Sequence, residues 1–224
     1  MNWTRLLTTD RPSTPADRAD PVGPGGGVEG NARLTGGAGA ALFLILAVEA
    51  VTLLQVKQLI SVHVFVGMLL VPLVLLKTST TGYRFAHYYR GDPPYQRKGP
   101  PHPILRITGP FLVASSLVLL GTGIALIALG RTVGHQYLWL HQATFLAWAA
   151  LIAVHTLGHL RETATLTAAD WQERNLRGDT EHRVAGARAR LSLLAVTLAV
   201  GTALGIASLG WIGTWHHIGD FGHG

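Results

Sequence analysis

The sequence predicts an all-α integral membrane protein in which five transmembrane helices form a bundle. Hydrophobic residues make up 48% of the 224-residue chain and charged residues only 13%, against about 25% charged residues in a soluble domain. Five apolar runs approach or exceed the ~20 residues that a helix needs to cross a bilayer. The basic residues, in addition, gather in alternate connecting segments. Together these observations exclude an ordinary soluble enzyme and a disordered chain.

The expected elements follow one another in a simple order. Residues 1–37 are rich in proline and glycine and are predicted to be a flexible tail rather than a signal peptide, because no apolar run lies close behind Met1. The bundle is expected over residues 38–212, followed by a short tail over 213–224. The expected spans are 38–56, 58–77, 107–129, 136–160 and 190–212.

Two polar segments separate these spans. The loop from Gly82 to Pro103 contains Gly–Asp–Pro–Pro and Gly–Pro–Pro–His–Pro, which cannot form a continuous helix. The segment 161–189 is polar and is expected to hold a short surface helix around Ala168–Leu176.

The distribution of basic residues predicts the orientation. If the N-terminus is cytoplasmic, 16 of the 18 lysines and arginines fall on the inner side, and only Lys57 and Arg131 remain outside. The positive-inside rule therefore favours an odd number of spans in a bacterial plasma membrane, with the C-terminus outside. The net charge of +6 then reflects topology and anionic lipid, so the bilayer rather than nucleic acid is the expected partner.

Histidines inside the spans are the candidate functional residues, because an ionisable side chain is costly within a membrane. His63, His141 and His155 lie in predicted spans, and His159 lies near an inner helix end. The spans that hold His63 and His141 run in the same direction, so these two imidazoles should sit at similar depth near the outer face. His155 follows on the same helix about 21 Å deeper, at ~1.5 Å per residue.

Two imidazoles at equal depth on parallel helices suit haem b, a flat apolar disc whose iron takes one axial ligand from each side. The chain has no cysteine, which excludes iron–sulfur clusters, cysteine-ligated zinc and covalently attached haem. Gly67, one turn after His63, would allow a macrocycle to approach closely. The alternative is that each histidine is a packing residue bonded to another helix.

The same residues carry a family resemblance. The stretch Leu140–His141–Gln142–Ala143–Thr144–Phe145, then Trp148 and His155–Thr156–Leu157–Gly158–His159–Leu160, resembles the haem-binding helix of membrane cytochromes b. The run His63–Val64–Phe65–Val66–Gly67 resembles its partner helix.

That superfamily includes cytochrome b subunits of hydrogenases and formate dehydrogenases and the membrane domains of ferric reductases. The resemblance covers about residues 40–160, and the whole chain is similar to actinobacterial membrane proteins of this type. It implies a four-helix haem-binding core, bis-histidine ligation, and an electron-transfer subunit of an oxidoreductase rather than a self-contained enzyme.

One departure concerns the inner half of the bundle. Where the family pattern has a second histidine on the partner helix, this sequence has Lys77. The next histidine is His87, and a turn near Gly82 would have to fold it back toward His155 or His159. One outer haem is therefore the first expectation, and a second, inner haem is the alternative.

The leading hypothesis is a b-type cytochrome that passes electrons between a membrane or cytoplasmic donor, with quinol as one alternative, and an acceptor near the outer face. A redox partner protein, a homo-oligomer or a larger complex would fit this function. The competing hypotheses are a cofactor-free membrane scaffold or binding subunit and a small transporter.

Several other polar residues have more than one interpretation at the level of the sequence. Glu49 in the first span is compatible with proton handling, with a bond to a neighbouring helix, or with an outward-reaching side chain. The C-terminal residues His216, His217 and His223 suit either weak metal binding or a solvated tail.

Overall fold

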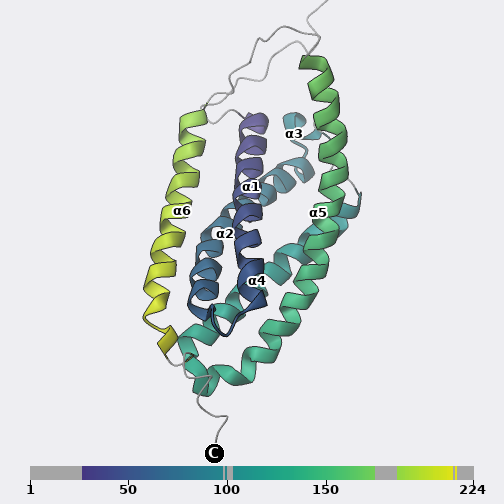
Figure 1. Cartoon of the computed structure of the whole chain (residues 1–224). Helices are drawn as coiled ribbons and strands as arrows, with labels where there is room; N and C mark the ends of the chain where they lie inside the picture. The colour runs from purple at the N-terminus through teal and green to yellow at the C-terminus, as the bar shows by residue number, and fades with distance from the viewer. Residues whose placement is uncertain (1–26, 98, 100–102, 175–185, 214, 216–224) are drawn as a thin grey trace, which may run out of the picture.

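The computed structural model describes residues 27–97, 99, 103–174, 186–213 and 215 (Figure 1). Side chains are described as far as Leu157 in the long helix that ends at Arg174. Within this part of the chain all regular structure is helical, which confirms the predicted fold class at the level of an all-α protein. The elements are α1 (Gly27–Leu54), α2 (Ile60–Tyr89), α3 (Pro93–Arg97), α4 (Pro103–Gly134), the short 3₁₀ helix η3 (His135–Tyr137), α5 (Leu138–Arg174) and α6 (Ala187–Leu209).

Four helical stretches are long and apolar enough to cross a membrane. They are Gly27–Leu54, Ile60–Tyr89, Arg106–Leu157 and Ala187–Leu209, with mean hydropathies between 2.0 and 2.4. The third stretch contains both α4 and α5, which fold back on each other at Gly130 and η3. Large apolar side chains point away from the protein, among them Leu54 (82% exposed) and Leu146 (69% exposed). Such a surface is compatible with a multi-pass membrane protein, since lipid can cover it.

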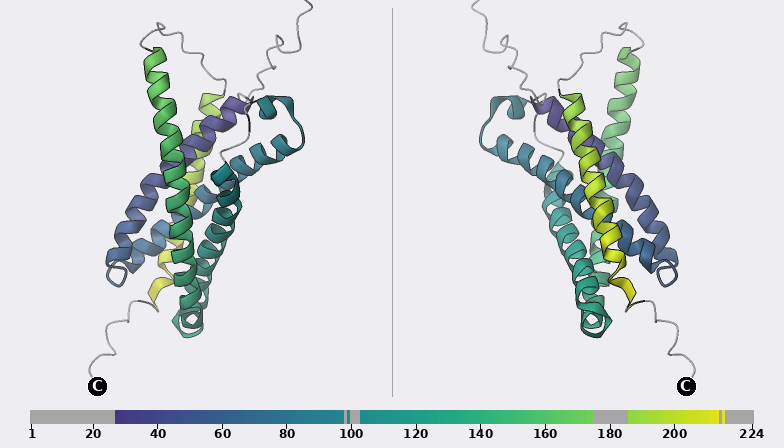
Figure 2. Two further views of the ribbon diagram at one scale, coloured as in Figure 1. Left: turned by 90° about the vertical axis from the view of Figure 1, so that its right-hand side faces the viewer. Right: turned by 90° about the vertical axis from the view of Figure 1, so that its left-hand side faces the viewer.

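Helix α2 is the central element. It packs against α1 on one side and α6 on the other, while α4 packs against α5 and only part of α4 touches α2. The buried residues of α2 include Val66, Leu70 and Leu73, whose spacing of four and three places them on one helical face. In Figure 1, α5 and α6 lie on opposite sides of the molecule with α1 and α2 between them. The views in Figure 2 show that α1 is inclined to α4 and α5 rather than parallel to them.

Two glycines bring α6 close to α2. A Cβ at Gly201 would lie 2.7 Å from the Leu69 carbonyl oxygen, and a Cβ at Gly205 would lie 2.7 Å from the Phe65 ring. Small residues four positions apart allow such close helix contact in membrane proteins. Because Phe65 is two residues from His63, this contact also supports the α2 segment that carries the first candidate histidine.

The first helix begins at Gly27, earlier than the expected boundary near residue 38. Contacts with α2 account for the extra turns: Asn31 Nδ2 donates to the Thr80 carbonyl at 3.1 Å, and Lys77 Nζ donates to the Thr35 carbonyl at 2.8 Å. Tertiary contacts of this kind override the low helix propensity of a glycine-rich segment. Residues 27–37 of the predicted tail therefore belong to α1, and residues 1–26 lie outside the described residues.

Two further boundaries differ from expectation. Helix α2 continues through Gly82 and ends at Tyr89, and Gly91 just beyond it has a left-handed φ of 87°. The turn proposed near Gly82 is wrong, because a single glycine weakens a helix by only about 1 kcal/mol and does not stop it. Helix α5 likewise continues to Arg174, so residues 168–174 extend a long helix instead of forming a separate one.

The two ends of the bundle differ in charge (Figure 1). One end holds the start of α1, the end of α2, α3 and the start of α6, while the other holds the α1–α2 connection and η3. Described basic residues at the first end are Arg33, Arg84, Arg90, Arg97, Arg106, Arg188 and Arg190, whereas the second end has Lys57 and Arg131.

Candidate functional site

His63 and His141 meet in the structure. Each is the fourth residue of its helix, in α2 and α5 respectively, and these two helices run in the same direction (Figure 1). The ring centroids are 6.5 Å apart and the ring planes differ by 82°, so the rings do not stack. The pair lies toward the end of the bundle that carries Lys57 and Arg131.

The His63 ring is held by α1. Its Nδ1 lies 2.6 Å from Glu49 Oε1 and 3.2 Å from Thr52 Oγ1. The Thr52 hydroxyl donates to the Glu49 carbonyl oxygen at 2.7 Å, and its oxygen lies 3.3 Å from Glu49 Oε2. Glu49 and His63 are mostly buried, with side chains 13% and 21% exposed. The tight α1–α2 connection brings them together, and pairing of this kind is what allows a carboxylate inside a membrane protein.

The His141 ring is held by α4. Its Nδ1 lies 3.0 Å from Thr122 Oγ1. The Thr122 hydroxyl also lies 2.8 Å from the Val118 carbonyl oxygen and 2.9 Å from the Leu119 carbonyl oxygen. A Cβ at Gly123 would approach His141 Cε1 to 3.2 Å, so glycine at this position lets the ring lie against the α4 backbone.

These partners determine which nitrogen of each ring carries the proton. The single hydroxyl proton of Thr122 goes to a backbone carbonyl, which can only accept, so Thr122 Oγ1 accepts from His141 Nδ1–H. An ionised Glu49 likewise accepts from His63 Nδ1–H. In each neutral imidazole Nε2 then carries the lone pair. Each ring can then offer the Nε2 lone pair to a metal ion.

The spacing of the rings fits one iron atom. With both Nε2 atoms turned toward one metal, two metal–nitrogen bonds of about 2.0–2.1 Å and two ring radii of about 1.2 Å would place the centroids about 6.5 Å apart, the distance that separates them here. Metal-binding histidines almost always donate their other N–H to a carboxylate, carbonyl or hydroxyl partner. Glu49 and Thr122 occupy these positions.

There is also room beside the pair. A Cβ added at Gly67, one turn after His63, would meet no atom within 4 Å. The α2 and α5 backbones are not closely packed against each other, although their histidine side chains meet. The Gly67 position therefore leaves space beside the α2 backbone one turn after His63.

The donor set suits haem better than a bare metal ion. Among the described residues no group of three or more histidine, aspartate or glutamate side chains is arranged to hold a metal ion. Haem itself supplies four nitrogen ligands to the iron, so the protein has to provide only the axial ligands. Two imidazoles are therefore sufficient for haem and insufficient for a typical zinc site.

His87 belongs to a different cluster. Its Nδ1 pairs with Asp92, and its ring packs against Tyr83 and Tyr95 with centroids at 4.1 and 5.1 Å. Tyr95 is buried, and burial, reinforced by the neighbouring Tyr83, raises the pKa of its phenol. The described contacts of His87 thus join the end of α2 to α3, and its role as an inner haem ligand stays a prediction.

The other two candidates lie on α5. His155 is partly buried. His159 is part of the same helix, but its side chain lies outside the described residues, as do His216, His217 and His223.

Lys77 points toward α1 rather than toward α5. Its ammonium donates to the Thr35 carbonyl at 2.8 Å, and a Cβ at Gly39 would lie 2.9 Å from Nζ. Lys77 therefore links α1 and α2. Gly39 provides the space in which the ammonium sits.

Replacing Gly39 with alanine is expected to displace the Lys77 ammonium and destabilise the protein. The loss of a hydrogen bond to a charged group destabilises the protein by about 1.5–3 kcal/mol. The better helix propensity of alanine offsets about 1 kcal/mol of this loss. Thermal unfolding of the detergent-solubilised protein measures the difference. In a Lys77→Met background the same Gly39→Ala change should cost nothing, and an equal loss in both backgrounds would disprove the role of this contact.

Sequence reasoning missed both threonines of the site. Thr52 and Thr122 were not candidates, because threonine is common in membrane helices and usually bonds to its own backbone. Glu49 was recognised but left with three interpretations, and the structure shows a bond to a neighbouring helix, to His63 itself. The only sequence signal for Thr122 was its position between Gly121 and Gly123.

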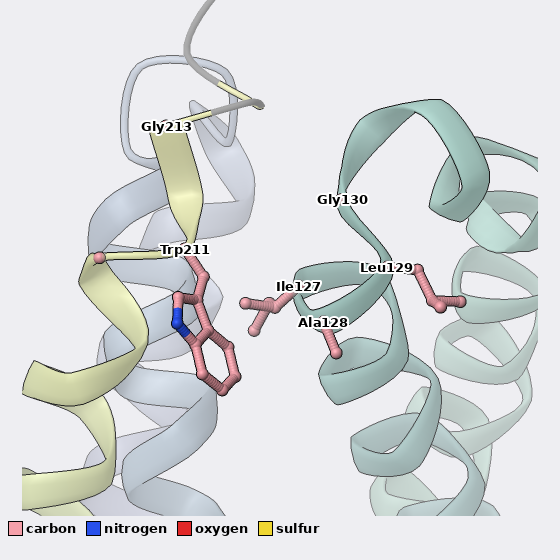
Figure 3. Close-up of a pocket in the computed structure, with 7 residues that line it drawn as sticks. Ile127, Ala128, Leu129, Gly130, Trp211 and Gly213 are labelled. Carbon is pink, nitrogen blue, oxygen red and sulfur yellow. The ribbon is translucent and has the colours of Figure 1, made fainter.

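A shallow groove lies at the same end of the bundle (Figure 3). It has a volume of about 530 Å³ and is lined by Ile127, Ala128, Leu129, Gly130, Gly210, Trp211 and Gly213. The Trp211 indole reaches from the end of α6 toward Ile127 and Ala128 on α4. None of these lining residues is titratable, so the groove offers apolar contact rather than chemistry.

Comparisons with protein-family models, curated proteins and solved structures gave no match to this chain. The functional assignment therefore rests on the geometry of the histidine pair and on the sequence.

Proposed function

We propose that this protein is a transmembrane b-type cytochrome that binds one haem b between His63 and His141. One observation carries the proposal: two imidazoles on helices that run in the same direction lie with their centroids 6.5 Å apart, and each is bonded through Nδ1 to an oxygen. A pair of packing histidines needs neither this spacing nor two matching oxygen partners.

The residues of the site have distinct roles in this proposal. When bound, haem supplies a one-electron change between ferric and ferrous iron. His63 and His141 would hold the iron, and Glu49 and Thr122 would fix the orientation and tautomer of the two rings. The apolar helices around them exclude water, which influences the reduction potential.

The proposed topology has five crossings, formed by α1, α2, α4, α5 and α6, with the N-terminus in the cytoplasm of a bacterium. The basic end of the bundle supports this orientation, because positive residues favour the cytoplasmic side. The histidine pair then lies near the outer face of the plasma membrane. From there electrons would pass between a membrane or cytoplasmic donor, such as quinol, and an outer acceptor or partner protein.

The test is an optical spectrum of the purified, detergent-solubilised protein before and after dithionite reduction, with a pyridine haemochrome count. We expect a sharp low-spin b-type spectrum and about one haem per chain. Absence of haem after expression with haem supplied would contradict the proposal and favour a scaffold or transporter. A count of two would require an inner site at His155 or His159 with His87.

A further inference from the structure

The two proposed axial histidines have chemically different partners. His63 Nδ1 lies 2.6 Å from a carboxylate oxygen of Glu49, whereas His141 Nδ1 lies 3.0 Å from the hydroxyl oxygen of Thr122. A carboxylate carries a full negative charge, and charge-assisted hydrogen bonds are shorter and roughly twice as strong as neutral ones.

The Glu49 carboxylate is held in place for this contact. It lies near the end of α1, where the Thr52 hydroxyl bonds to the Glu49 backbone carbonyl and lies beside Oε2. Thr52 is itself only 2% exposed, and the Glu49 side chain is 13% exposed. Solvent therefore screens the carboxylate only weakly, and its effect on the ring is larger than it would be at the surface.

Thr122 cannot act in the same way. Its hydroxyl proton is given to a backbone carbonyl of α4, so its oxygen accepts from His141 as a neutral dipole. It orients the ring without drawing the Nδ1 proton away from it.

We infer that Glu49 is a positioning residue that makes His63 the stronger axial ligand and lowers the haem reduction potential, with His141 as the weaker ligand. This inference rests on the proposed function. A carboxylate that accepts the Nδ1 proton increases the electron density and basicity of the ring. A more basic ligand stabilises ferric iron relative to ferrous iron, which lowers the potential. If Glu49 merely joined α1 to α2, its charge would not affect the iron.

The experiment compares Glu49→Gln with Thr122→Val by spectroelectrochemical titration of the haem-loaded protein at one fixed pH. Glutamine keeps the size and an accepting oxygen but removes the charge. Each tenfold change in the ratio of ferric to ferrous affinity shifts a one-electron potential by about 59 mV, so a tenfold loss of the preference for ferric iron would raise the potential by about 60 mV. Thr122→Val should move it by less than half as much.

Haem content separates the possible failures. An unchanged potential in Glu49→Gln with haem still bound, or an equal rise in Thr122→Val, would disprove the inference and leave the cytochrome proposal intact. Absence of haem from the unsubstituted protein would disprove the cytochrome proposal itself. If Glu49→Gln binds no haem, Glu49→Asp decides, because it keeps the charge on a shorter side chain. Its potential should rise by less than the roughly 60 mV expected for loss of the charge, and a rise of about 60 mV or more would overturn the inference.

Discussion

Replacing His63 with leucine is expected to remove haem from the protein, and His141→Leu is expected to abolish the low-spin spectrum. The haem content of His63→Leu should fall by more than about tenfold, because even loss of an outer-shell partner typically costs roughly 10–100-fold in metal affinity. Any haem that remains in His141→Leu should be five-coordinate and high-spin, with His63 as its single protein ligand. Haem per chain and the optical spectrum measure both effects.

The matched control is His87→Leu, the same substitution in the cluster with Asp92, Tyr83 and Tyr95. It should leave the haem count and the spectrum unchanged. A fall by one haem in this variant would show that a second, inner site exists. Full haem content in both His63→Leu and His141→Leu would contradict the proposed site and show that other residues hold the haem.

Gly201→Ala is expected to destabilise the bundle by about 1–3 kcal/mol, the usual range for overpacking a well-packed contact. The added Cβ would lie 2.7 Å from the Leu69 carbonyl oxygen and 3.1 Å from Leu69 Cα. Because these are backbone atoms, no side-chain rotation relieves the clash and α6 must move away from α2. Thermal unfolding should show a lower midpoint, and under the proposed function haem should dissociate from the His63 site more readily.

Gly82→Ala is the matched control within α2. A Cβ there would meet nothing within 4 Å, so the change should stabilise the helix by up to about 1 kcal/mol through propensity alone. If Gly201→Ala were as stable as Gly82→Ala, the close α2–α6 contact would not contribute to stability.

Much of the fold could be predicted because the hydropathy of a segment and its helix-breaking residues, proline and glycine, determine each helix separately. The described cores of the expected spans are helical, and the prolines and Gly91 interrupt the chain after α2. The start of α1 at Gly27 could not be predicted in this way. It depends on Asn31 and Thr35 meeting α2, and such a contact between distant residues leaves no periodic signal in a glycine-rich segment.

The same distinction applies to the candidate site, where some features follow from the sequence and others depend on contacts between helices. By itself the sequence determined that the chain is apolar and helical and that its basic residues are distributed unevenly between the two ends. It also predicted that His63 and His141 lie at matching depths, because the rise per residue converts sequence position into depth along a helix. Only the tertiary structure decided that Glu49 and Thr122 hold the two rings, that His87 joins Asp92, and that Lys77 turns toward Thr35. The physical reason is that contacts between helices depend on how the helices are rotated and how far apart they lie. Close packing at sites such as Gly201 and Gly205 determines this rotation and separation.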